Sequence, residues 1–278
     1  MPAERIGESL AFINWTVLTA LGVGAFAAVV AGRFRTDATR GYLGFTAFSA
    51  AAFALLAFLA DGGLPALSRD FGVRSDPAWD TPRRLAMGAL PILAAAYGVA
   101  VWRGRRALPI ALAGLSAAAL VLVAGALSWG GGGLGSLLLV VELATLSAAL
   151  GGVWAAMILG HWYLVTPKLP EAPLIRFSRW LGVALAVQLV LFVVWLGFGA
   201  GPAGTPGFAA LVGPWALFVW LRLIVGLVFP LVVSWAAVQT ARSRSMESAT
   251  GLLYINVGTI AAGTILAAGL YFGVGLLV

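Results

Sequence analysis

The stretch Leu146–Trp162, LSAALGGVWAAMILGHW, matches an earlier stretch, Leu18–Phe34, LTALGVGAFAAVVAGRF, without a gap. Both stretches carry small residues at every fourth position, a spacing that places them on one face of a helix. Small residues let a second helix approach closely, so we expect both faces to contact protein. The match therefore indicates one helical unit that occurs twice in the chain. The small residues are Ala20, Gly24, Ala28 and Gly32 in the first copy and Ala148, Gly152, Ala156 and Gly160 in the second.

The composition indicates a protein whose solvent is the lipid bilayer. Of the 278 residues, 62% are hydrophobic and only 10% are charged, which is too little charge for the surface of a soluble protein of this length. The chain has no cysteine, which excludes an iron–sulfur cluster held by its own thiolates, and its one histidine, His161, excludes a bis-histidine haem. The formal net charge is +7, but the basic residues are scattered among loops, so we expect no nucleic-acid binding.

Eight apolar runs are each long enough to cross roughly 30 Å of hydrocarbon as a helix. The predicted fold is therefore all-α, a polytopic integral membrane protein with eight transmembrane helices. The runs lie near residues 12–32, 42–60, 84–102, 108–128, 137–160, 180–199, 215–239 and 251–277.

The loops between these runs alternate in charge, and the odd-numbered loops are strongly basic. Basic loops remain in the cytoplasm, so this pattern predicts a protein of the cytoplasmic (inner) membrane with both termini outside. The basic residues of these loops are Arg33, Arg35, Arg40, Arg103, Arg105, Arg106, Lys168, Arg176, Arg179, Arg242 and Arg244.

The internal match continues beyond the first helix of each half. Pro91, Arg103 and Arg105 correspond to Pro230, Arg242 and Arg244, and the separation between matched residues increases along the chain, as loop insertions would make it. We therefore expect two four-helix bundles, 1–129 and 137–278, joined by a flexible glycine-rich linker, 130–136. An even number of spans in each half makes this a parallel repeat about an axis along the membrane normal. Pro91 and Pro230 predict kinks in the third helix of each half.

The repeat also sets the depth of the charged residues within the spans. Arg222 precedes Arg242 by twenty residues, about 30 Å of helix, and Arg83 precedes Arg103 by the same length, so both arginines should lie near the outer edge of the hydrocarbon.

Glu142 should lie at the same outer level as Arg222. It precedes His161 by nineteen residues, about 28 Å of helix, and its counterpart in the first half is Asn14. A glutamate and an arginine at matching depth should come close enough to pair, because a lone charge in lipid costs several kcal/mol. Such a pair is either structural or part of a ligand site.

His161 lies at the inner end of the fifth span, beside Trp162 and Tyr163. This position is typical of an aromatic belt at the membrane interface. The alternative is a hydrogen bond to a quinone, or a haem ligand that another chain completes. Gln188 and Asn256, within later spans, are typical of side chains that hold helices together.

The chain resembles the membrane anchor subunits of molybdopterin oxidoreductases, the NrfD/DmsC type, in its eight spans, external termini and two four-helix bundles. Local similarities are Ala60-Asp61-Gly62-Gly63-Leu64-Pro65, Trp220-Leu221-Arg222, and Ala262-Gly263 with Tyr271-Phe272-Gly273. In that family such positions lie near a quinone pocket on the outer side, beneath an external catalytic subunit. An acidic residue that the family would place early in the third span is missing here.

The resemblance implies a membrane subunit of a redox or respiratory complex that is not catalytic alone, with quinone as its candidate cofactor. The outer loop 61–83, with Leu64, Phe71 and Trp79 among charged residues, is the surface expected to contact other subunits. A transporter or lipid carrier that works between the halves, or a scaffold or assembly factor, are the alternatives. No catalytic or metal-binding set is predicted, and the candidate ligand-binding residues are Glu142, Arg222, Asn14, Arg83 and His161.

Overall fold

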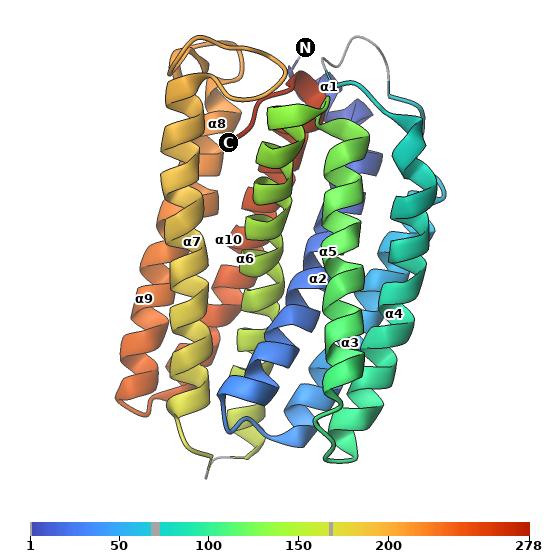
Figure 1. Ribbon diagram of the computed structural model, residues 1–278. Helices are drawn as coiled ribbons and strands as arrows, with labels where there is room; N and C mark the ends of the chain where they lie inside the picture. Colours follow the sequence, from blue (N-terminus) through green and yellow to red (C-terminus); the bar gives the residue numbers. More distant parts are fainter. Residues whose placement is uncertain (1, 68–72, 167–168) are drawn as a thin grey trace.

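The computed structural model describes residues 2–67, 73–166 and 169–278, and these residues form a bundle of helices without a strand (Figure 1). Eight segments among them are long and apolar enough to cross a membrane, which confirms the all-α prediction and its eight apolar helices. Short elements, α1 (Pro2–Glu8) and η3 (Ala209–Leu211), lie outside these segments. The eight segments are α2 (Leu10–Arg35), α3 (Arg40–Asp61), η2 with α4 (Pro77–Trp79 and Asp80–Trp102), α5 (Leu108–Trp129), α6 (Gly133–Val165), α7 (Ala172–Phe198), α8 with η4 and α9 (Ala216–Leu223, Ile224–Val228 and Phe229–Arg242), and α10 (Met246–Val274).

Three helices, α2, α6 and α10, form the centre of the bundle. α2 packs against α3, α6 and α10, and α10 also packs against α6 and α9. In Figure 1, α3, α4 and α5 lie on one side of this centre and α7, α8 and α9 on the other, with both chain termini at the same end of the bundle. The α2–α3 and α4–α5 connections, which carry many of the arginines, lie at the opposite end.

The backbones of α2 and α6 meet at two glycines. A Cβ atom added to Gly24 would lie 1.7 Å from the carbonyl oxygen of Ser147, and one added to Gly151 would lie 2.2 Å from the backbone nitrogen of Ala25. The small-residue prediction is therefore correct for Gly24 and, on α6, for the buried Ala156 and Gly160, but the contact with α2 is made by Gly151 and not by Gly152. A Cβ on Gly152 would meet no atom within 4 Å. Ala148, on the same predicted face, is exposed.

The glycine-rich connection between α5 and α6 is shorter than the sequence suggests. α6 begins at Gly133, so residues 133–136 of the predicted linker are helical. Gly131, Gly132 and Gly133 have φ values of +73°, +84° and +50°, a region that favours glycine because it has no Cβ atom. This glycine run lets the chain reverse within a few residues between two long helices.

The seventh apolar segment is not a uniform α-helix, because residues Ile224–Val228 form one π-helical stretch between α8 and α9. Pro230 is the second residue after this stretch and has no N–H to donate one turn back, which weakens the regular helix at the place where the sequence predicted a kink. Gly226, within the π stretch, packs against Gly263 of α10, where an added Cβ would lie 2.6 Å from the Gly263 Cα. Pro91, by contrast, lies within the continuous helix α4.

Candidate functional site

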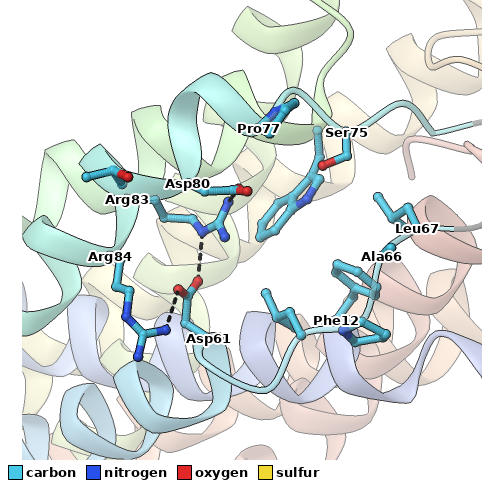
Figure 2. Close-up of a pocket in the computed structure, with 13 residues that line it drawn as sticks. Phe12, Asp61, Ala66, Leu67, Ser75, Pro77, Asp80, Arg83 and Arg84 are labelled. Atoms are coloured by element: carbon cyan, nitrogen blue, oxygen red, sulfur yellow. Dashed lines mark hydrogen bonds and ion pairs between the residues drawn. The ribbon is translucent and has the colours of Figure 1, made fainter.

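A pocket of about 560 Å³ opens at the end of the bundle that carries the termini (Figure 2). Its walls come from the start of α2, the end of α3, the start of α4, the end of α5 and the segments that connect α3 to α4. One side of the pocket is ionic and the other is apolar. The residues that line it are Phe12, Asp61, Leu64, Pro65, Ala66, Leu67, Ser75, Pro77, Asp80, Thr81, Arg83, Arg84 and Trp129.

The ionic wall is built on a buried pair, Asp61 and Arg83. Asp61 is the last residue of α3, and Arg83 lies in the first turn of α4, so the two charges meet where this helical hairpin closes. The Nε atom of Arg83 donates to the Oδ1 atom of Asp61 at 2.7 Å, and the side chains are only 5% and 2% exposed. Trp15 of α2 donates its indole N–H to the same Oδ1 atom at 3.0 Å. Three helices therefore hold this carboxylate in place.

The remaining donors of Arg83 bind further elements of the bundle. One terminal nitrogen donates to Asp80 at 2.9 Å and to the hydroxyl of Ser128 at 2.6 Å. The guanidinium carbon lies 4.6 Å from the centre of the Trp129 ring, a cation–π contact. A buried arginine with this many partners is fixed in one orientation, which stabilises the wall of the pocket.

The second oxygen of the Asp61 carboxylate is less fully occupied. A terminal nitrogen of Arg84, whose side chain is half exposed, lies 3.9 Å from this Oδ2 atom. Figure 2 shows Arg84 approaching Asp61 from the side opposite Asp80. Asp61 can therefore accept a further hydrogen bond, and Arg84 can donate one, to a molecule in the pocket.

A second buried ionic cluster joins α6, α7 and α8. A terminal nitrogen of Arg222 lies 3.9 Å from Oε1 of Glu142, and both side chains are buried. The same nitrogen donates to the amide oxygen of Gln188 at 3.1 Å, and Nε of Arg222 donates to the carbonyl oxygen of Val278 at 3.3 Å. The predicted proximity of Glu142 and Arg222 is confirmed.

This second cluster leaves two buried polar atoms without a hydrogen-bond partner, Oε1 of Glu142 and Nε2 of Gln188. Neither residue lines the pocket of Figure 2. The π-helical stretch begins two residues after Arg222, and such stretches are frequent at functional sites. The geometry is compatible with both predicted roles, a structural pair and a ligand site.

The five candidate residues thus lie in different places. Arg83 belongs to the pocket, and Glu142 pairs with Arg222, but Asn14 is exposed and joins neither group. Its neighbour Trp15 points inward instead, because one residue along a helix turns the side chain by about 100°. His161 is exposed near the other end of α6, where Nδ1 lies 3.4 Å from the hydroxyl of Tyr254.

The carboxylate that pairs with Arg83 was not among the candidates. Asp61 belongs to the ADGGLP sequence on which the family resemblance is based. An aspartate at the end of an apolar run, however, is usually a solvent-exposed residue at the end of a span, so its burial could not be predicted. Gln188 was expected to hold helices together, and it does so through Arg222. Phe71, expected at the docking surface, and Lys168, expected in a basic loop, lie outside the described residues.

The described residues contain no group of three or more His, Cys, Asp and Glu side chains that could hold a metal ion. Comparisons with models of protein families, with curated proteins and with solved structures found no match to this chain.

Proposed function

We propose that this protein is an integral membrane subunit of a redox assembly and that it binds a quinone in the pocket bounded by Asp61, Arg84 and Trp129. The observation that carries the proposal is the combination, in one open pocket, of a fixed buried ion pair with an apolar wall. The residues Asp61, Leu64 and Pro65, which carried the resemblance to the quinone-binding anchor subunits, all line it.

The two sides of the pocket suit the two parts of a quinone. The flat ring can lie against Phe12 and Trp129, which supply apolar and aromatic surface. A quinone oxygen needs a hydrogen-bond donor, and Arg84 offers a guanidinium that is half exposed. A quinol hydroxyl needs an acceptor instead, and the Oδ2 atom of Asp61 can accept its hydrogen bond.

Oxidation of a quinol releases two electrons and two protons. In this proposal the carboxylate of Asp61 accepts one proton from a quinol hydroxyl while Arg83 holds the carboxylate in position, and the second proton leaves to solvent through the open side of the pocket. The electrons pass to a redox group of a partner subunit, because the chain has no cysteine for an iron–sulfur cluster of its own. The described part of the outer segment 61–83 forms the rim of the pocket, so a partner that docks there would lie directly above the quinone.

The membrane arrangement is part of the same proposal. The eight apolar segments support insertion in the inner membrane, and the arginine-rich connections at the end opposite the termini support a topology with both termini outside. The proposed duplication is supported by the close contact of α2 with α6, the first spans of the two halves. It is also supported by the matching positions of Arg83 and Arg222. Each arginine is buried near the start of the third span of its half and lies beside a carboxylate.

Quinone binding can be tested with purified protein in a non-ionic detergent. A short-chain benzoquinone should quench part of the fluorescence of the eleven tryptophans in a saturable manner, because Trp129 lines the pocket and Trp15 binds Asp61. Arg84→Gln should weaken binding about tenfold, the loss expected for one hydrogen bond to a charged group, while Arg74→Gln, an exposed arginine of the same outer segment that does not line this pocket, should not. Quenching that never saturates, or equal weakening in both variants, would contradict the proposal.

A carrier function is the second candidate, and the cluster of Glu142, Gln188 and Arg222 is the observation that favours it. Buried polar atoms without partners, next to a π-helical stretch, are features that a transport site would use. The test is uptake of a labelled organic anion into vesicles that contain the protein. Uptake that Arg222→Met abolishes, while quinone binding remains, would favour a carrier over a redox subunit.

A further inference from the structure

A second cavity, of about 550 Å³, lies at the end of the bundle opposite the quinone pocket. It is formed by the end of α2, the α2–α3 connection, the start of α3 and the connection between α4 and α5. We call it the arginine pocket. Its lining residues are Arg33, Phe34, Arg35, Thr36, Asp37, Ala38, Thr39, Arg40 and Arg106.

The charge of the arginine pocket is not balanced by the protein. It contains four guanidinium groups and a single carboxylate, that of Asp37. The ion pairs found among the described residues are made by other arginines: Arg83, Arg84, Arg222 and Arg244. The positive-inside rule explains why arginines gather at this end, but it requires only charge in a loop and no concave arrangement.

Two further observations indicate an anion in this cavity. Nε of Arg33 is buried and has no hydrogen-bond partner, while NH2 of the same side chain donates to the carbonyl oxygen of Gly104 at 3.2 Å. A buried cationic donor without an acceptor is costly, and an anion in the cavity would lower that cost through its charge while the Nε atom itself stays covered by protein. The pocket also adjoins the N-terminus of α3, capped by Thr39, where free backbone N–H groups and the helix dipole favour negative charge.

We infer that the arginine pocket binds the phosphate group of an anionic membrane lipid. Arginine forks match phosphate oxygens, and a lipid headgroup at this end of the bundle would lie at the membrane surface. The exposed side chains of Trp102 and Leu108 flank the same α4–α5 connection and would contact the acyl region. This inference rests on the proposed membrane insertion but is independent of quinone binding.

The test compares two double variants of the delipidated protein in a non-ionic detergent, with lipid binding measured by native mass spectrometry. Wild-type protein should bind phosphatidylglycerol more tightly than phosphatidylcholine. Arg40→Gln with Arg106→Gln should weaken phosphatidylglycerol binding by about tenfold or more, because each removes one positive charge from the pocket. Arg105→Gln with Arg242→Gln removes the same charge from this end of the bundle outside the pocket and should change binding less than about twofold.

Equal weakening by the two double variants would overturn the inference, because general surface charge would then account for binding. Binding of inorganic phosphate as tight as that of phosphatidylglycerol would overturn the assignment to a lipid. If the first double variant fails to fold, the wild-type protein still decides the question: equal affinity for the two lipids, or affinity for phosphatidylglycerol that does not fall as salt is raised, would refute a phosphate site. Saturable quinone quenching would remain unaffected by either result.

Discussion

Adding one methyl group at Gly151 or at the adjacent Gly152 should have opposite effects on stability. The two substitutions lie in the same helix and bring the same gain in helix propensity, up to about 1 kcal/mol. At Gly152 the new Cβ would meet no atom within 4 Å, so Gly152→Ala should be neutral or slightly stabilising. At Gly151 the new Cβ would lie 2.2 Å, 2.3 Å and 2.4 Å from backbone atoms of Ala25 and Gly24, which no side-chain movement can relieve.

Relief of this clash requires the two helices to separate. Ordinary contact begins at 3.4 Å, so α6 must move away from α2 by roughly 1 Å, and the contacts on both sides of the crossing are weakened. Overpacking of this kind costs about 1–3 kcal/mol, and the two variants should differ by this amount, because the gain in helix propensity is the same in both and cancels. The measurement is the thermal unfolding midpoint of each purified variant in the same detergent, followed by tryptophan fluorescence. Equal midpoints for Gly151→Ala and Gly152→Ala would refute the proposed close approach of α2 and α6.

Three further predictions concern the ion pairs and the topology. Glu142→Gln should destabilise the protein by about 3–5 kcal/mol in thermal unfolding, because Arg222 loses its counter-charge. Combining it with Arg222→Met should recover much of that loss. An unaltered stability of the single variant would favour the ligand-site role. The pKa of Glu171 lies below its ordinary value of 4.5, first because the carboxylate accepts a hydrogen bond from its own backbone N–H and then because Arg244 donates to it. The carboxylate therefore contributes stability above pH 4.5, and this contribution is lost as the pH falls through the lowered pKa. Arg244→Gln should raise that pKa part of the way to 4.5, measured by carbon-13 NMR of labelled glutamate, and no change would show that the salt bridge has no effect. A reporter fused after Val278 should be active outside the cytoplasm, and activity inside would contradict the proposed topology.

The sequence predicted the length and number of the apolar helices well, because hydrophobic length is a property of one segment at a time. It predicted the depth of Glu142 and Arg222 for a similar reason, since helix length counted from a loop fixes a level along the bundle axis. It did not fix the rotation of the helices. A shift of one residue turns a side chain by about 100°, so the exposed Asn14 stands next to the buried Trp15, and Gly152 stands next to Gly151, which makes the contact with α2.

The pocket beside Asp61 and Arg83 was harder to predict because its parts are brought together only by packing. Asp61 ends one helix and Arg83 begins the next, so the sequence shows two charges at the two ends of a polar loop. Their pairing depends on how the hairpin of α3 and α4 closes against Trp15 and Ser128, contacts that link residues far apart in the chain. The π-helical stretch was hard to predict for the same reason. Pro230 indicates a weak point in the helix, but the contact of Gly226 with Gly263 joins two residues far apart in the sequence and cannot be predicted from either one.

The glycine crossing between α2 and α6 is the point about which α2 would pivot if it tilted. Gly24 lies near the middle of α2, with about 15–20 Å of helix on either side. A tilt of about 5° around this point would move the two ends of α2 in opposite directions by roughly 1–2 Å each, while the helices stay in contact. Phe12, near one end of α2, lines the pocket beside Asp61, and Arg33, near the other end, lines the arginine pocket. A tilt of α2 would therefore change both cavities at once. If the end of α2 moved away from one cavity wall, its other end would move in the opposite direction at the second cavity.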